Sequence, residues 1–167
     1  MPDQDPELRS LLLERRIMQT LARYCTFLDE YDIEGVMACF TPDATADYGP
    51  GRGGLVQGRE AIAARIARGQ ADFRRTHHQL GQVAIGLRRH TASATSYVTA
   101  WHERTDGTQE VLCLRYVDRL RQVEGAWLVS HRQVHVSFVD GFPATRWRWV
   151  RRRRPAAPLS SLRRARS

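Results

Sequence analysis

Lysine is absent from this 167-residue chain, so all 26 of its basic side chains are arginines. Cysteine is scarce: the chain has three, Cys25, Cys39 and Cys113, and none belongs to a CxxC pair. An odd number at wide spacing excludes a disulfide framework and a cysteine zinc site, and it indicates buried thiols in a reducing compartment. No hydrophobic run approaches the roughly 20 residues that cross a bilayer. We therefore expect a cytoplasmic protein with no membrane span.

The net charge of +8 comes from one end of the chain. Nine arginines lie beyond Thr145, where no acidic residue occurs, so residues 1–145 carry a net charge of −1. The sequence predicts one domain over residues 1–142 and an Arg-rich, disordered tail over residues 143–167. Blocks of like charge are more often solvated tails than sites. The alternative is that the tail binds nucleic acid or an anionic surface, with its two tryptophans stacking, but no nucleic-acid-binding motif accompanies it.

Helical patterns dominate the first half of the chain. Residues 7–28 place apolar side chains at intervals of three and four, which is typical of a helix with one buried face. Asp32 can cap a second, short helix that ends near Phe40, and residues 60–73 predict a third. Residues 44–48 fit a short strand. The glycine cluster at 49–54 is expected to be a loop, and it lacks the glycine spacing of a phosphate-binding loop.

The pattern changes to strands after residue 77. Two of the breaks between the strand-like runs have turn residues of hairpin type. Helices first and strands last predict an α+β fold, a curved antiparallel sheet with helices packed on one face around an internal pocket. The four expected strands cover residues 78–88, 92–104, 109–122 and 126–139.

Two charged residues do not fit a plain core. Asp29 ends an otherwise apolar helical stripe, so it either faces the interior or, if the helix has already ended, is solvated. Arg132 falls on the apolar side of the last strand under period-two alternation. A buried guanidinium needs an anionic partner or a ligand. The alternatives for Arg132 are a ligand contact and a structural ion pair, with Asp29 or Asp118 as its partner.

Two adjacent histidines, His77 and His78, point to opposite faces of a strand, so one can face the interior. Strict alternation favours His77, whereas a bulge at Gly81 would exchange the faces and favour His78. A histidine can take and return a proton near neutral pH. No metal-ligand spacing accompanies the two residues, so we expect neither a metal nor another cofactor. Five further residues could line a pocket or only pack in the core: Tyr24, Tyr48, Trp101, His102 and Tyr116.

In the order of its elements the chain resembles the SnoaL-like branch of the nuclear transport factor 2-like superfamily, which has a cystatin-like fold and includes polyketide cyclases and scytalone dehydratase. The resemblance implies a cone-shaped α+β barrel, commonly a homodimer, that holds a hydrophobic small molecule. The stretches that carry it are Arg23–Asp29, Cys39–Tyr48, Gly58–Ile62, Thr76–Gly81, Arg115–Leu120 and Trp127–Arg132.

A catalytic site is implied by the same resemblance. A dehydrochlorinase of the superfamily has a helix-end Asp, a His before a Leu-Gly turn and an Arg after a Trp, and this pattern falls on Asp29, His78 and Arg132. His78 would be the base, Asp29 its orienting carboxylate and Arg132 a clamp for an oxyanion. Tyr24 replaces a lysine of that relative, which favours carbonyl or hydroxyl substrates over halide elimination.

This site is expected to be that of a cofactor-independent dehydratase, lyase or cyclase. Its substrate would be a hydrophobic molecule with a carbonyl or hydroxyl group, and the enzyme would act in secondary metabolism. Two alternatives remain open at this stage. One is an isomerase of the ketosteroid isomerase type. The other is a non-catalytic module that binds a ligand or partner in the same pocket, which predicts that Asp29 and His78 do not touch and that side chains fill the pocket.

Overall fold

Helix α1 (Pro6–Asp29) begins at Asp5, whose carboxylate accepts the backbone N–H of Glu7 at 3.0 Å. A proline fits the first turn because that turn has no use for its missing N–H. The computed structural model describes residues 5–142 and 145–151. The predicted helix over residues 7–28 is confirmed. Its buried face consists of Ile17, Thr20, Leu21, Tyr24, Cys25 and Leu28.

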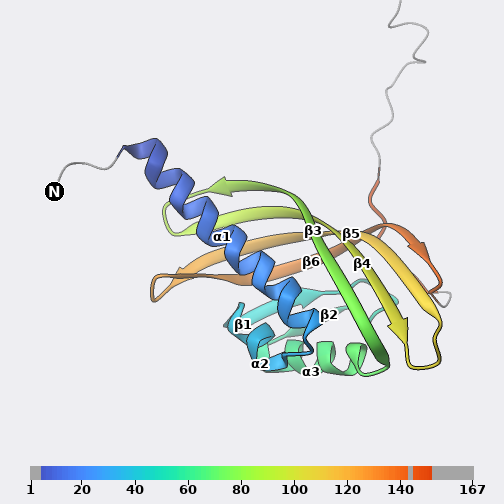
Figure 1. Cartoon of the computed structure of the whole chain (residues 1–167). Helices are drawn as coiled ribbons and strands as arrows, with labels where there is room; N and C mark the ends of the chain where they lie inside the picture. The colour runs from blue at the N-terminus through green and yellow to red at the C-terminus, as the bar shows by residue number, and fades with distance from the viewer. Residues whose placement is uncertain (1–4, 143–144, 152–167) are drawn as a thin grey trace, which may run out of the picture.

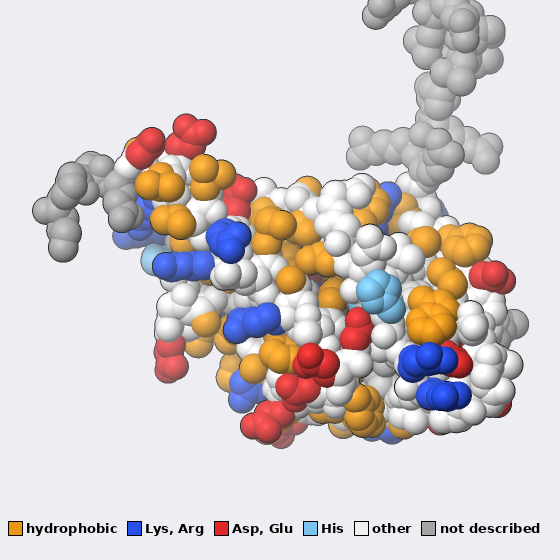
Figure 2. All heavy atoms as spheres, viewed as in Figure 1, with side chains coloured by type: hydrophobic (Ala, Val, Ile, Leu, Met, Phe, Trp, Pro, Cys, Tyr) orange, Lys and Arg blue, Asp and Glu red, His pale blue; other side chains and the backbone are white. Residues whose placement is uncertain are grey.

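The two halves of α1 have different surroundings. The first half projects beyond the sheet, where Figure 2 shows hydrophobic and acidic side chains together, and Leu8, Leu11 and Leu12 are exposed there. The second half crosses the concave side of the sheet (Figure 1). The helix therefore carries Tyr24 and Asp29 into the interior of the fold.

Both predicted short helices are present, and the first of them has the predicted cap. In α2 (Ile33–Ala38) the Asp32 carboxylate accepts the backbone N–H of Gly35 at 2.8 Å, which confirms Asp32 as the cap. Helix α3 (Arg59–Gln70) ends before residue 73, the predicted end, because the next strand has already begun there. Both helices lie at one end of the sheet (Figure 1).

The sheet has six strands in the order β2-β1-β6-β5-β4-β3. Its neighbours pair antiparallel except β1 and β6, which run parallel. The predicted α+β fold with a curved sheet is confirmed, but the sheet is open because its edge strands β2 and β3 do not pair in the described part of the chain. The strands are β1 (Phe40–Asp47), β2 (Leu55–Gln57), β3 (Phe73–Leu87), β4 (Thr91–Arg104), β5 (Gln109–Val123) and β6 (Ala126–Asp140).

A bulge in β3 decides which histidine faces inward. Leu80 pairs with Val98 and Val83 pairs with Ser96, so β3 uses one residue more than β4 between these two pairs. The extra residue at Gly81–Gln82 exchanges the two faces of the strand. His78 is consequently buried at 8% exposure, which selects the bulge alternative.

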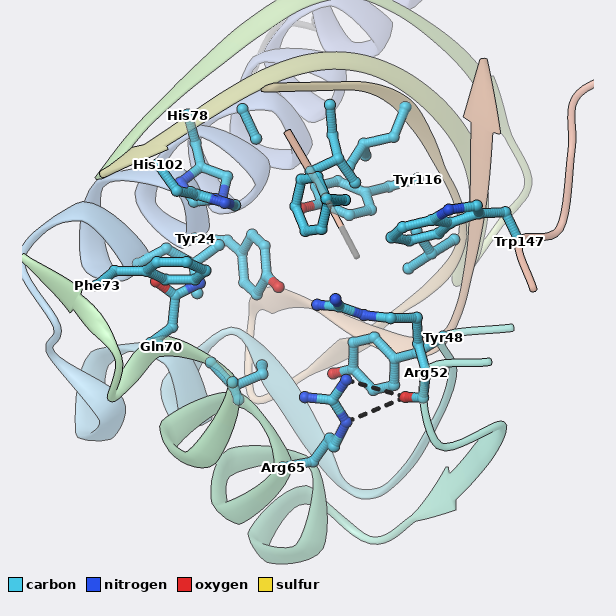
Figure 3. A pocket seen from close by; sticks show the side chains of 18 residues that line it. Tyr24, Tyr48, Arg52, Arg65, Gln70, Phe73, His78, His102, Tyr116 and Trp147 are labelled. Atoms are coloured by element: carbon cyan, nitrogen blue, oxygen red, sulfur yellow. Dashed lines mark hydrogen bonds between the residues drawn. The ribbon is translucent and has the colours of Figure 1, made fainter. Parts of the chain in front are cut away.

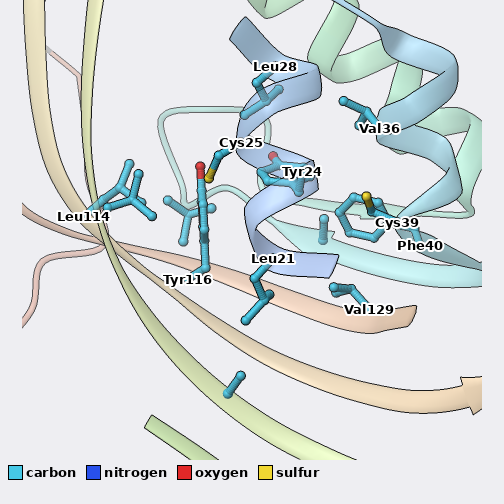
Figure 4. Close-up of a cluster of buried hydrophobic side chains, with 14 of the residues drawn as sticks. Leu21, Tyr24, Cys25, Leu28, Val36, Cys39, Phe40, Leu114, Tyr116 and Val129 are labelled. Carbon is cyan, nitrogen blue, oxygen red and sulfur yellow. The ribbon is translucent and has the colours of Figure 1, made fainter. Parts of the chain in front are cut away.

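The main core lies between α1 and the concave face of the sheet. Figure 4 shows Leu21, Tyr24 and Leu28 of α1 facing Leu114 and Tyr116 of β5. The Tyr24 ring meets the ring of Tyr116 edge to face, with centroids 5.6 Å apart. Such contacts place the tyrosines in fixed orientations at the boundary between the core and the interior pocket.

The prediction of a disordered tail from residue 143 is wrong for residues 145–151. Trp147 is 9% exposed and belongs to the core cluster. The backbone N–H of Val136 in β6 donates to the Arg148 carbonyl at 2.8 Å, and Arg148 pairs with Asp47. The run of like charge thus includes a segment that packs against the sheet and pairs one of its arginines with an aspartate. The rest of the predicted tail, residues 143–144 and 152–167, lies outside the described residues.

Candidate functional site

The end of α1 meets the start of β3 through Asp29 and His78. One carboxylate oxygen of Asp29, Oδ1, lies 2.7 Å from His78 Nδ1, and the other accepts the His78 backbone N–H at 2.9 Å. The Thr76 hydroxyl donates to Oδ1 at 2.9 Å. Three hydrogen bonds thus fix the carboxylate against the imidazole. Because Nδ1 donates to Asp29, His78 presents Nε2 to the interior.

A second histidine–carboxylate pair faces the first. His102 Nδ1 lies 3.1 Å from Glu110 Oε1, and the Arg104 guanidinium donates to Glu110 Oε2 at 2.6 Å. The two imidazoles approach each other through their Nε2 atoms, which are 3.4 Å apart. The pairing of β4 with β5 brings this pair together, because His102 lies directly opposite Glu110 in the register. The result is a chain of polar groups from Asp29 to Arg104.

Burial and hydrogen bonding act differently on the two pairs. Partial burial opposes ionisation of Asp29, but the hydrogen bonds from the His78 side chain and backbone outweigh it and lower the pKa of Asp29 below its usual value. Burial lowers the pKa of His102, against the opposing hydrogen bond from Glu110. Asp29 is therefore a carboxylate and His102 a neutral imidazole at neutral pH.

Arg132 lies behind the wall of the pocket. Its Nε and Nη2 donate to the two carboxylate oxygens of Asp118 at 2.8 and 2.7 Å, and both side chains are fully buried. The guanidinium carbon is 4.1 Å from the centre of the Tyr24 ring and 4.0 Å from that of Tyr116. Of the two alternatives for Arg132, the structure has the structural ion pair, with Asp118 as the partner, and not the ligand contact.

The pocket lies between α1, α3 and the sheet, with a cavity volume of about 90 Å³ and a mouth that is open to solvent. His78 and His102 lie on one side of it, and four of the five residues predicted to line it do so: Tyr24, Tyr48, His102 and Tyr116 (Figure 3). Trp101 does not, and that prediction is wrong, because strand alternation turns its side chain to the opposite face of β4 from Ala100 and His102. Its indole N–H donates to Gln109 instead.

Other kinds of site find little support in the residues that the structure describes. No group of three or more His, Cys, Asp or Glu side chains in residues 5–142 and 145–151 is arranged to hold a metal ion. No helix in the same residues is long and apolar enough to cross a membrane. The polar side chains that line the pocket are imidazole, guanidinium, phenol and amide groups.

A model of the SnoaL-like domain matches residues 9–133, three quarters of the chain. The chain belongs to the SnoaL-like family. None of the curated proteins matches it. Solved structures with the same NTF2-like fold do, and among them is a candidate scytalone dehydratase from Novosphingobium aromaticivorans, 24% identical, with a TM-score of 0.80 over 87% of this chain and 97% of that one.

Two further structures extend the comparison. A hexachlorocyclohexane dehydrochlorinase of type 2 is 12% identical, with a TM-score of 0.72 over 90% of this chain and 99% of that one. A candidate dehydratase of the NTF2-like family from Streptomyces avermitilis is 12% identical, with a TM-score of 0.65 over 72% and 93% of the two chains. At these identities the likeness shows the fold that this SnoaL-like chain shares with them.

Several lining residues of this SnoaL-like pocket were missed by the sequence analysis. Arg52 comes from the glycine-rich loop, Arg65 from α3, and Phe142 and Trp147 from the segment that follows β6. Glu110, which holds His102, was also missed. The only available signal was Trp147, an aromatic residue within a charged run, because the other four have ordinary polar or loop surroundings in the sequence.

Proposed function

We propose that this chain is a cofactor-independent lyase or cyclase that removes a proton from a carbon next to a carbonyl in a hydrophobic small molecule. The observation that carries the proposal is the Asp29–His78 contact of 2.7 Å at the wall of an apolar pocket. The carboxylate occupies Nδ1, so Nε2 is the free base. Dehydration of a β-hydroxy carbonyl compound uses this arrangement most directly. Ring closure onto a second carbonyl begins with the same step.

The dehydration proceeds in two proton transfers. His78 Nε2 takes the proton from the α-carbon, and the electron pair of the C–H bond moves onto the carbonyl oxygen as an enolate. The enolate then re-forms the carbonyl and the new C=C bond while the β-hydroxyl leaves, protonated by the imidazolium, as water. Asp29 stabilises the imidazolium between the two steps.

The oxygen of the enolate needs hydrogen-bond donors, and we assign them to Tyr24 and Tyr48. Both residues line the pocket, and the buried Tyr48 hydroxyl has no partner among the described residues. Burial raises the pKa of both phenols, so they remain protonated donors at neutral pH. Such donors are effective because they are oriented before the charge develops.

His102 gives the proton a second place to reside. With both carboxylates ionised, each Nδ1 holds the proton that it donates, and the two Nε2 atoms present lone pairs to each other across 3.4 Å. A proton that His78 takes from the substrate then lies between two nitrogen acceptors. His102 can therefore accept that proton from His78 in turn.

Arg132 enters this mechanism as a positioning residue. Its guanidinium contacts the face of the Tyr24 ring and does not line the pocket. The ion pair with Asp118 holds the Arg132 guanidinium in place, and the cation–π contact with the guanidinium in turn orients the Tyr24 ring. A non-catalytic ligand-binding module, the alternative, predicts that Asp29 and His78 are apart, so their contact supports the enzyme.

The base can be tested without knowing the leaving group, through exchange of the α-protons of 1-tetralone, a bicyclic ketone, in deuterated water. We expect the wild-type protein to catalyse the exchange and His78→Ala to lower the rate by about 10²- to 10⁴-fold. Proton NMR measures the exchange. Dehydration of 3-hydroxy-1-tetralone to 1-naphthol, followed by absorbance, should fall in parallel.

The neighbouring histidine supplies a matched control. His77 is exposed on the opposite face of β3, so His77→Ala should keep the wild-type rate. Circular dichroism checks that both variants remain folded. A His78→Ala variant that is folded and exchanges the ketone as fast as His77→Ala would remove His78 from the mechanism.

A further inference from the structure

The side of the pocket away from the histidines carries two arginines. Arg52 and Arg65 both line it, and no aspartate or glutamate does. Neither guanidinium forms an ion pair with a residue that the structure describes. Figure 3 shows Arg52 reaching into the pocket beside Tyr24 and Tyr48. A cavity lined by two cations without a carboxylate presents a positive wall to whatever it holds.

Arg65 is already engaged. Its Nε and Nη2 donate to the backbone carbonyl of Arg52 at 3.1 and 2.9 Å, and its guanidinium carbon lies 5.0 Å from the centre of the Tyr48 ring. These contacts fix the loop that carries Arg52. The positive charge of Arg65 therefore lies at the pocket, but its Nε and Nη2 donors are already used by the Arg52 backbone carbonyl.

Arg52 has its donors free. Its guanidinium carbon lies 5.5 Å from the ring of Phe142 and 5.3 Å from that of Trp147, so its position is set by aromatic rings rather than by acceptors. No described residue accepts a hydrogen bond from its side chain. The side chain is half-buried, and burial together with the charge of Arg65 lowers the pKa of Arg52. A half-buried guanidinium without acceptors is stabilised by an anion that enters beside it.

The segment of residues 145–151 contacts the loop that carries Arg52. The Gly51 backbone N–H donates to the Arg146 carbonyl at 2.8 Å, and the Thr145 hydroxyl donates to the Gly51 carbonyl at 3.0 Å. The segment that brings Trp147 to the pocket therefore also fixes the residue before Arg52. These contacts fix the backbone from which the Arg52 side chain extends toward Phe142 and Trp147.

We propose that the pocket binds a carboxylate group of its substrate through Arg52, with Arg65 and the Tyr48 hydroxyl beside it. The inference rests on the proposed function for the claim that the bound acid is the substrate. One free guanidinium fork matches one carboxylate, which it binds with two parallel hydrogen bonds. We assign a carboxylate rather than a phosphate monoester, because one free guanidinium compensates the single charge of a carboxylate but not the roughly two charges of a phosphate. The substrate class is thus a hydrophobic acid, held by its carboxylate at Arg52 with its reacting carbon toward His78.

Binding of simple acids tests the site. The probes are benzoate, 3-phenylpropanoate and 2-naphthoate, each compared with its neutral primary amide at pH 8 by isothermal titration calorimetry on the full chain. We expect at least one acid to bind about 10- to 100-fold more tightly than its amide. Arg52→Gln removes the guanidinium and should reduce this preference to within about threefold. The variant keeps the backbone carbonyl that Arg65 contacts, so the loop should stay in place.

A matched control separates the site from the net charge. Arg68 lies one turn beyond Arg65 and is exposed away from the pocket, so Arg68→Gln removes the same charge and should keep the preference. The proposal is overturned if no acid binds more tightly than its amide, or if Arg52→Gln keeps the preference that Arg68→Gln keeps. Tighter binding of 2-naphthyl phosphate than of 2-naphthoate would overturn the assignment to a carboxylate.

The His78→Ala variant keeps this test distinct from that of the proposed function. We expect it to retain the preference for the acid, because Arg52 and not an imidazole binds the carboxylate. Loss of the preference in His78→Ala would assign the anion to the histidine side and overturn the proposal. Failure of ketone exchange in the wild-type protein would leave the carboxylate site standing and remove only the proposed function.

Discussion

Two pairs, each of a carboxylate and a basic side chain, lie on the concave side of this sheet, and they differ in their access to water. Asp118 and Arg132, on neighbouring strands, are fully buried and joined by two hydrogen bonds. Asp29 and His78 join the end of a helix to a strand, and the Asp29 side chain keeps 25% of its surface exposed. The first pair is sealed inside the protein, and the second is open at one side.

The comparison indicates what each pair can do. A buried ion pair must remain charged and paired, because loss of one partner leaves an uncompensated charge away from solvent. It can fix a wall of tyrosines but cannot exchange protons. A partly solvated carboxylate beside an imidazole can gain and lose a proton with little reorganisation. We therefore expect a structural role for the sealed pair and a chemical role for the open pair, although the sequence analysis gave catalytic roles to residues of both.

The largest expected effect comes from breaking the sealed pair. Arg132→Leu leaves Asp118 buried without a partner and should lower the free energy of unfolding by about 3–5 kcal/mol. Urea denaturation measures it. The double variant Arg132→Leu/Asp118→Leu should recover much of the loss, because no charge remains unpaired. Arg121→Leu, at the exposed pair with Asp43, is the control and should have a far smaller effect. Equal losses in the Arg132 and Arg121 variants would contradict the comparison.

Breaking the open pair should affect the rate more than the stability. Asp29→Asn removes the charge that stabilises the His78 imidazolium, so the rate of 1-tetralone exchange should fall by about 10²-fold with little change in KM. The free energy of unfolding should change less than in Arg132→Leu. Glu30→Gln, an exposed neighbour that loses the same charge, should keep the wild-type rate. A rate loss shared by Glu30→Gln would point to the general electrostatic field rather than to the contact.

Local patterns were enough to predict most of the fold. The spacing of apolar residues located α1, and Asp32 was identified as a cap because a side-chain oxygen before a helix has one common use. Asp29 was ambiguous because a helix end and a solvated turn have the same local pattern. The family resemblance resolved it, together with the choice of His78, whose face depends on the bulge at Gly81.

What the sequence could not show depends on contacts between distant segments. Glu110 meets His102 only through the register of β4 and β5, and nothing near Glu110 in the chain indicates that its side chain is buried. Arg52 lies in a loop that could be read only as a break between elements. Trp147 was assigned to a tail because its neighbours are charged, whereas its burial depends on the edge of a pocket that forms only in the folded chain.

The smallest expected effect is on the pH dependence of stability. It concerns His102, which contacts His78 of the open pair. Because burial lowers the pKa of His102, the unfolded chain binds more protons than the folded one as pH falls through the usual histidine value near 6.5. Stability is then highest above that value and declines as pH approaches the folded pKa. His102→Gln can still donate to Glu110 but does not titrate, so its urea midpoint should fall less between pH 7.5 and 5.5. Part of the decline that remains in the variant comes from His135, because burial also lowers the pKa of that residue. Parallel declines in both proteins would mean that folding leaves the pKa of His102 unchanged. A steeper decline in His102→Gln would mean that His102 is already charged when folded, and the two imidazoles would then share a proton before any substrate arrives.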